Sequence, residues 1–294
     1  MWKNILVGIG ELEEVPVLLA AACAIAKVRN SSLTIVTVAN IPDWASIYGS
    51  DSTLREDGFN LYQPLLLKAQ AEASKYGLRV KTELPFGNPA ESIINYLKQN
   101  QFDLVVLGHK RRSSLNRWLL GSVASKVVSY SPCSVLIVRS KLGWNNILVA
   151  LDASPAAARA LEFVLDLGAA TDVSIEAAAV VPIPNYAGTI GEVETARQFG
   201  EQFYSGILAK AQWAAQKRKL NLRTHLFFGD PAERILHYLT QKHNDMVVLG
   251  HKGTSNIREI LLGSTAYKLV NYSPCSVLII KNVATESSPG KELE

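Results

Sequence analysis

The residues Asp-Met-Val-Val-Leu-Gly-His-Lys-Gly at positions 245–253 are followed by nine residues and then by Gly-Ser-Thr at positions 263–265. An apolar run stops at Gly250, a second glycine follows at Gly253, and an amphipathic segment leads to Gly263, where an apolar helix pattern starts. This order predicts a buried strand, a glycine-punctuated loop and a helix start. Glycines let backbone N–H groups converge on a ligand, and a helix N-terminus adds unpaired N–H groups and a positive dipole end. The stretch therefore predicts a phosphate-binding loop.

The spacing of this loop distinguishes it from other phosphate-binding sequences. It reads G-x2-G-x9-G-[ST], and it is not a Walker A sequence, because Lys252 precedes the second glycine and no Gly-Lys-[Ser/Thr] ending follows. The pattern resembles the universal stress protein family, in particular its ATP-binding branch. The resemblance implies that the loop holds the ribose and phosphates of ATP. The alternative is that the glycines only shape a tight turn between a strand and a helix.

The chain contains an internal repeat at a fixed offset. Four segments recur 142 positions later with few changes: residues 4–7, 87–91, 105–110 and 130–137. A constant offset predicts two homologous domains, over residues 1–140 and 145–282, followed by a flexible tail over residues 283–294. Each copy is long enough for its own core, which excludes a solenoid. The resemblance covers both copies.

Apolar runs alternate with helical patterns in each copy. In the first copy they predict strands over residues 3–9, 33–39, 79–84, 103–108 and 134–139, and helices over residues 16–29, 53–76, 89–99 and 119–130. The second copy follows at the same offset. Asn88-Pro89 and Asp230-Pro231 predict capped helix starts. We expect an α/β fold of two tandem, doubly wound, five-stranded parallel-sheet domains, and the resemblance implies the adenine nucleotide alpha hydrolase-like type. Ligands then lie beyond the carboxyl ends of the strands.

A carboxylate stands at the end of the first predicted strand of the second copy. Asp152 follows that strand, and Ser154-Pro155 opens the next helix. From the carboxyl end of a parallel strand, Asp152 could accept a hydrogen bond from a ribose hydroxyl or an adenine edge. Helix capping is its alternative role, although Ser154 could serve as the cap instead. The resemblance implies that Asp152 contacts the nucleoside and that the backbone of Val180 meets the adenine.

The phosphate end of the predicted site depends mainly on backbone N–H groups. The Ser264 hydroxyl is a further donor or a link to Mg²⁺, so the expected ligands are ATP and, with it, Mg²⁺. His251 has no second His, Cys or carboxylate at ligand spacing, so we expect a histidine near phosphate and no metal site. The predicted phosphate-binding residues are Gly250, Gly253, Gly263, Ser264 and Thr265, with His251 and Lys252 flanking the loop.

The first copy departs from this pattern at two points. Gly10 stands where the second copy has Asp152, and Arg111 stands where it has Gly253, while the Gly-Ser pair is kept at residues 121–122. We expect the first copy to have lost ATP binding, since Arg111 would be strained if its position requires a positive φ and could project into the phosphate space. The alternative is that Arg111 is a new anion ligand.

Composition limits the classes of partner. The formal net charge is +4 over 294 residues, without a long basic block, so nucleic acid is not an expected partner. The apolar segment at residues 15–28 is too short to span a membrane and follows three glutamates, so we expect no membrane insertion. The three cysteines form no CxxC pair and no secreted framework, which predicts reduced thiols in the cytoplasm.

The favoured function is that of a cytosolic stress-response protein that holds ATP in its second domain as a signal or switch. No catalytic residues are assigned, because no nucleophile and base share a site. A slow ATPase or nucleotide-dependent enzyme and a ligand-free interaction module are the alternatives.

The fifth strands of the two copies should pair. Residues 135–138 and 277–280 would otherwise be exposed apolar edges, so we expect an antiparallel pseudo-dimer within the chain, with a higher homo-oligomer as a further candidate. Three strand spacings amount to ~14 Å. The five-residue connection at residues 140–144 reaches roughly 17 Å, which is enough.

Overall fold

The computed structural model describes residues 2–40, 52–109, 120–139, 145–183, 190–253 and 262–281, with the backbone alone described at residues 52–57 and 190. Arg111, the connection at residues 140–144 and the tail at residues 283–294 lie outside the described residues. Within them, no helix is long and apolar enough to cross a membrane.

Strands and helices alternate through both copies. The elements of the first copy are β1 (Asn4–Gly8), α1 (Val15–Arg29), β2 (Ser32–Val36), α2 (Ser52–Ser74), β3 (Val80–Glu83), α3 (Pro89–Gln99), β4 (Leu104–Gly108), α4 (Ser122–Tyr130) and β5 (Ser134–Val138). Those of the second copy are β6 (Asn146–Leu151), α5 (Pro155–Ala170), β7 (Ser174–Val181), α6 (Ile190–Lys217), β8 (Leu222–Phe228), α7 (Pro231–Gln241), β9 (Met246–Gly250), α8 (Ser264–Tyr272) and β10 (Ser276–Ile280).

The predicted elements are confirmed, with small differences at their ends. Asn88 and Asp230 cap α3 and α7 through their side-chain oxygens, as their positions before proline predict. Strand β8 runs two residues beyond its predicted end, because Phe227 and Phe228 pair with the end of β7. Helix α4 begins later than predicted, at Ser122, because Gly121 has an extended backbone.

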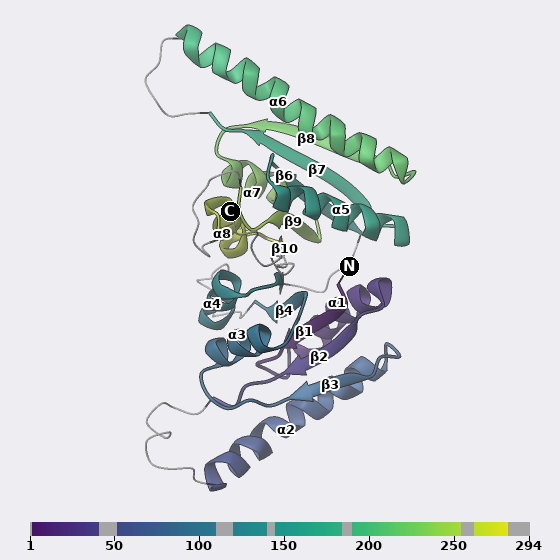
Figure 1. Ribbon diagram of the computed structural model, residues 1–294, viewed down its shortest axis with the longest axis vertical. Coiled ribbons are helices and arrows are strands. Elements are labelled where there is room, and N and C mark those ends of the chain that lie inside the picture. The colour runs from purple at the N-terminus through teal and green to yellow at the C-terminus, as the bar shows by residue number, and fades with distance from the viewer. Residues whose placement is uncertain are drawn as a thin grey trace, which may run out of the picture.

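One ten-stranded sheet runs through the molecule in the order β3-β2-β1-β4-β5-β10-β9-β6-β7-β8. Each half has the order 3-2-1-4-5 with parallel neighbours, which is the doubly wound arrangement predicted from the sequence. Helices α1, α2, α5 and α6 cover one face and α3, α4, α7 and α8 the other (Figure 1). Each face has its own apolar core, and both cores continue from one copy into the other.

The two copies join where β5 pairs with β10. This pair is antiparallel, whereas the other neighbouring strands of the sheet are parallel, and it confirms the predicted pairing of the fifth strands within the chain. Both strands are buried over their whole length, and Leu136 lies opposite Leu278 at the centre of the register. Strand β6 lies three strand positions from β5, which is the separation assumed for the connection.

Two cations reinforce this seam, one from each copy: Lys281, which is buried, and Arg139, which is half-buried. The Lys281 ammonium donates to the carbonyl oxygens of Val128 (2.7 Å) and Ser131 (2.8 Å) at the end of α4. Arg139 stands 142 positions earlier, and its guanidinium donates to carbonyl oxygens in the last turn of α8. Burial lowers the pKa of Lys281 to about 8 and that of Arg139 to about 10. Each copy therefore places a cation at the negative end of a helix of the other copy.

Truncation of Leu278 to alanine tests the seam. Because Leu278 is fully buried opposite Leu136, we expect Leu278→Ala to lower the free energy of unfolding by about 2–5 kcal/mol in urea titrations. Leu61→Ala is the matched control, since Leu61 is 72% exposed. Equal stability of the two variants would contradict a seam built on this pair.

Candidate functional site

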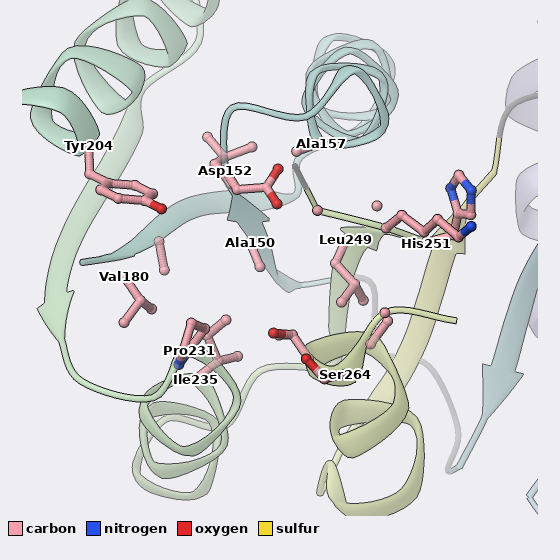
Figure 2. Close-up of a pocket in the computed structure, with 18 residues that line it drawn as sticks. Ala150, Asp152, Ala157, Val180, Tyr204, Pro231, Ile235, Leu249, His251 and Ser264 are labelled. Carbon is pink, nitrogen blue, oxygen red and sulfur yellow. The ribbon is translucent and has the colours of Figure 1, made fainter. Parts of the chain in front are cut away.

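A cavity of about 260 Å³ opens in the second copy, beyond the carboxyl ends of β6, β7 and β9 (Figure 2). The chain leaves β6 for β7 on one side, and β9 lies on the other side of β6, so this is the topological switch point of the half-sheet. Every residue predicted for the site lines this cavity: Asp152, Val180, Gly250, His251, Gly253, Gly263, Ser264 and Thr265, together with the flanking Lys252.

Asp152 does not cap helix α5. Ser154 takes that role, because its hydroxyl oxygen accepts the N–H of Ala157 at 3.1 Å. The Asp152 carboxylate instead accepts the N–H of Ser154 through Oδ1 at 2.9 Å. Figure 2 shows the carboxylate at the end of β6, directed away from Tyr204. A carboxylate fixed in this way can accept hydrogen bonds from a bound molecule.

Position 253 has little space for a side chain, which explains the glycine there. A Cβ atom there would lie 2.9 Å from Asp152 Oδ2. Gly253 does not have the positive φ that would strain a side chain at this position, since among the described residues the glycines with positive φ are Gly77, Gly87 and Gly229. Asp152 and Gly253 are therefore direct neighbours, and a side chain at position 253 would displace the carboxylate.

The ends of the glycine loop are held close to two helix starts. A Cβ atom at Gly250 would lie 2.9 Å from the backbone nitrogen of Ala157, so α5 begins directly against the end of β9. The Gly263 N–H donates to the His251 carbonyl at 2.8 Å, which brings the second end of the loop to the first. Gly263 precedes α8 and provides no side-chain cap for its first N–H groups. These N–H groups belong to residues that line the cavity, and uncapped N–H groups at a helix start are the kind of donor that suits an anion.

His251 contributes backbone to the cavity, while its ring lies elsewhere. Its N–H donates to the Ile280 carbonyl at 3.0 Å, and Figure 2 shows the imidazole directed away from the space between Asp152 and Ser264. Burial lowers the pKa of the imidazole, and the positive charges of Lys281 and Lys252 lower it further. The lowered pKa favours the neutral imidazole, and the direction of the ring differs from the expected histidine side chain beside a phosphate.

Apolar residues form a further wall of the cavity, and the sequence analysis did not identify most of them. Tyr204 of α6 lies near Asp152, and its pKa is raised by burial and by that carboxylate. The repeat carried the missing signal, since Tyr62, Pro89 and Ile93 recur at the same offset as Tyr204, Pro231 and Ile235. The remaining apolar lining comes from Ala150, Leu151, Ala157, Ala178, Val180, Leu249 and Ala266.

Comparison with known proteins assigns this chain to a protein family. A sequence model described as the universal stress protein family matches residues 1–139 and again residues 143–281. The chain belongs to the universal stress protein family, with two copies of its domain in tandem.

Relatives agree with this assignment at the level of one copy. Putative universal stress proteins of Staphylococcus haemolyticus (strain JCSC1435) and Staphylococcus aureus (strain USA300) are each 30% identical over 142 residues, which is 48% of this chain and 86% of theirs.

Solved structures share the whole two-copy fold. A universal stress protein of Archaeoglobus fulgidus DSM 4304 superposes with a TM-score of 0.72 at 20% identity, over 95% of this chain and 98% of that one. A putative universal stress protein of Pseudomonas aeruginosa UCBPP-PA14 gives a TM-score of 0.70 at 18% identity, over 96% and 94% of the two chains. At these identities the likeness establishes the fold.

Proposed function

We propose that the chain binds one ATP molecule in the cavity of the second copy and that occupancy of this site acts as a signal. The observation that carries the proposal is the meeting of the Asp152 carboxylate, the glycine loop and the start of α8 around one cavity. A carboxylate suits ribose hydroxyls, and uncapped N–H groups suit phosphates.

The two ends of the cavity support one orientation of the nucleotide. The apolar wall at Val180 and Ile235 suits the adenine, with the Val180 backbone meeting its edge. The volume of about 260 Å³ lies just below the ~300–1,000 Å³ of typical ligand pockets, so the cavity would enclose the nucleoside. The triphosphate would then extend along Gly250 and Gly253 to the N–H groups of Ser264 and Thr265.

Magnesium would depend largely on the nucleotide itself. Among the described residues, no group of three or more His, Cys, Asp or Glu side chains could hold a metal ion. Mg²⁺ keeps several waters and commonly binds through phosphate oxygens, so the Ser264 hydroxyl would supply the protein contact.

We also propose that the protein is located in the cytoplasm. Cys23, Cys133 and Cys275 are buried free thiols, and burial raises the pKa of each to about 11. Such thiols are typical of a reducing compartment. A homo-oligomer of the two-copy chain is a further candidate state.

Calorimetric titration of the full chain with ATP tests the site. We expect a stoichiometry of one, and no measurable binding to Gly253→Arg, because a side chain at position 253 displaces the Asp152 carboxylate and fills the phosphate end. Gly206→Arg is the matched control, since a Cβ atom at Gly206 would meet nothing within 4 Å. Two equivalent sites would refute the proposal, as would ATP binding that survives Gly253→Arg.

We further expect ATP to be held with little turnover. Phosphoryl transfer needs an aligned nucleophile and stabilisation of charge in the transition state, whereas backbone N–H groups bind the ground state well. The rate for purified protein should fall far below the ~1–10³ s⁻¹ typical of enzymes, and Lys252→Ala should change affinity more than rate. Turnover within that range, lost in Lys252→Ala or His251→Ala while nucleotide still binds, would favour the enzyme alternative.

A further inference from the structure

Helix α6 carries exposed aromatic side chains at one end of the molecule. Figure 1 shows α6 and β8 at this end, and α2 and β3 at the opposite end. Phe199, Phe203 and Trp213 are 69%, 54% and 59% exposed. The Lys217 ammonium lies 3.4 Å from the centre of the Trp213 ring, and more than half of this tryptophan still faces solvent. Single exposed apolar side chains are common, whereas several on one helix form the kind of patch that marks an interaction surface.

The aromatic residues follow the spacing of a contact between two helices. Steps of four, three, four and three residues lead along α6 through Phe199, Phe203, Gly206, Lys210 and Trp213, which we call the aromatic stripe. Residues at this spacing lie along one side of a helix, as in the contact seam of packed helices. The buried residues of α6 pack against β7 and β8 from a different side of the helix. The aromatic stripe is therefore not part of the core.

The aromatic stripe is complementary to a second copy of itself. Phe199 and Trp213 each lie seven residues, about two turns, from Gly206. When two α6 helices cross in antiparallel orientation at Gly206, each Phe199 therefore faces Trp213 of the partner subunit. Lys210 and Phe203 become neighbours in the same pairing, which suits contact of an ammonium group with an aromatic face. A Cβ atom at Gly206 would meet nothing within 4 Å, and the lack of a side chain there lets the two backbones approach closely.

The charges of α6 and the residues after it favour the antiparallel orientation. Residues 190–203 contain three glutamates and one arginine, whereas residues 206–219 contain four basic residues and no acidic one. An antiparallel pair places the acidic half of each helix beside the basic half of the other, whereas a parallel pair places like charges together. Arg218 is already paired with Glu162 of α5. The other basic residues of the second half are exposed: Lys210, Lys217 and Lys219.

The first copy does not repeat the aromatic stripe. Asp57, Pro64 and Ala71 occupy the equivalent positions of α2, 142 residues before the two aromatic ends and the central glycine of the stripe. A surface that pairs with the same surface of a second chain closes at two copies. Contact through α6 therefore produces a dimer and not a filament.

We propose that the protein forms a homodimer through antiparallel contact of two α6 helices that cross at Gly206. This interface identifies the surface for the homo-oligomer named above and does not depend on ATP binding. The exposed parts of the three aromatic side chains amount to roughly 300–400 Å² per chain. Two stripes thus supply about half of a standard interface of ~1,200–2,000 Å², and the flanks of the 28-residue helices supply the rest. We expect a dissociation constant on the order of micromolar.

Sedimentation equilibrium of the full chain over a concentration series tests the interface. We expect a monomer–dimer equilibrium, and a dissociation constant raised about tenfold or more in Gly206→Arg, because two arginines meet at the crossing point. The fold should tolerate this change, since glycine is the weaker helix former. Gln212→Arg is the matched control and should change the dissociation constant by less than about threefold. Gln212 is exposed and follows Phe203 by nine residues, which places it on the opposite side of α6.

Cross-linking tests the antiparallel orientation. The native thiols Cys23, Cys133 and Cys275 are buried, so a short bis-maleimide reacts chiefly with an added surface thiol. In an antiparallel pair the two Gly206 positions adjoin, whereas the two Lys217 positions lie ~33 Å apart along the helix axis. We expect Gly206→Cys to give cross-linked dimers and Lys217→Cys to give few.

Four results would overturn the proposal: a monomer at every concentration, assembly beyond a dimer, equal dissociation constants for wild type and Gly206→Arg, or equal cross-linking of Gly206→Cys and Lys217→Cys. ATP titration separates this interface from the proposed function. Gly206→Arg should bind ATP as the wild-type chain does, because Gly206 does not line the cavity. Absence of ATP binding in the wild-type chain refutes the nucleotide site and leaves the dimer to be decided by sedimentation.

Discussion

The antiparallel pairing of β5 with β10 is the interaction on which the arrangement of this molecule depends. Five-stranded parallel sheets end in an apolar strand edge, and an exposed edge of this kind invites aggregation. Here each copy covers the edge of the other, and a single ten-stranded sheet results. The Ser134 hydroxyl oxygen accepts the backbone N–H of Lys281, and the Ser276 hydroxyl oxygen accepts that of Arg139, both at 3.2 Å. Each copy therefore provides a hydrogen-bond acceptor for the residue that follows the fifth strand of the other copy.

Once the copies are joined in one chain, their two cavities are free to diverge. The first copy has Gly10 in place of Asp152 and Arg111 in place of Gly253. In the second copy these two positions are direct neighbours. There, a Cβ atom at the loop position would lie 2.9 Å from the carboxylate at the strand end, and the first copy has a side chain at the loop position and no carboxylate at the strand end. Glu14 also lines the cavity of the first copy, where its carboxylate packs over Gly108 at the end of β4.

Much of the fold could be predicted from the sequence, because the apolar runs and the repeat at 142 positions specify strands, helices and their pairing at the seam. The clustering of Asp152 with the glycine loop was also predictable, since carboxyl ends of neighbouring parallel strands converge. The roles of Arg139 and Lys281 were not, because their acceptors are helix ends of the other copy, more than 120 residues away. The direction of the His251 ring and the packing of Glu14 over Gly108 likewise depend on tertiary contacts that no local pattern carries.

The central claim is that nucleotide binds the second copy and not the first. Backbone amide NMR of ¹⁵N-labelled full chain tests it most directly, because the glycine and helix-start N–H groups are the proposed phosphate ligands. On addition of ATP, the account predicts large shifts of the amide signals of Gly250, Gly253, Ser264 and Thr265, with those of Gly108 and Ser122 unchanged. Shifts of Gly108 and Ser122 equal to those of Gly250 and Ser264 would contradict it.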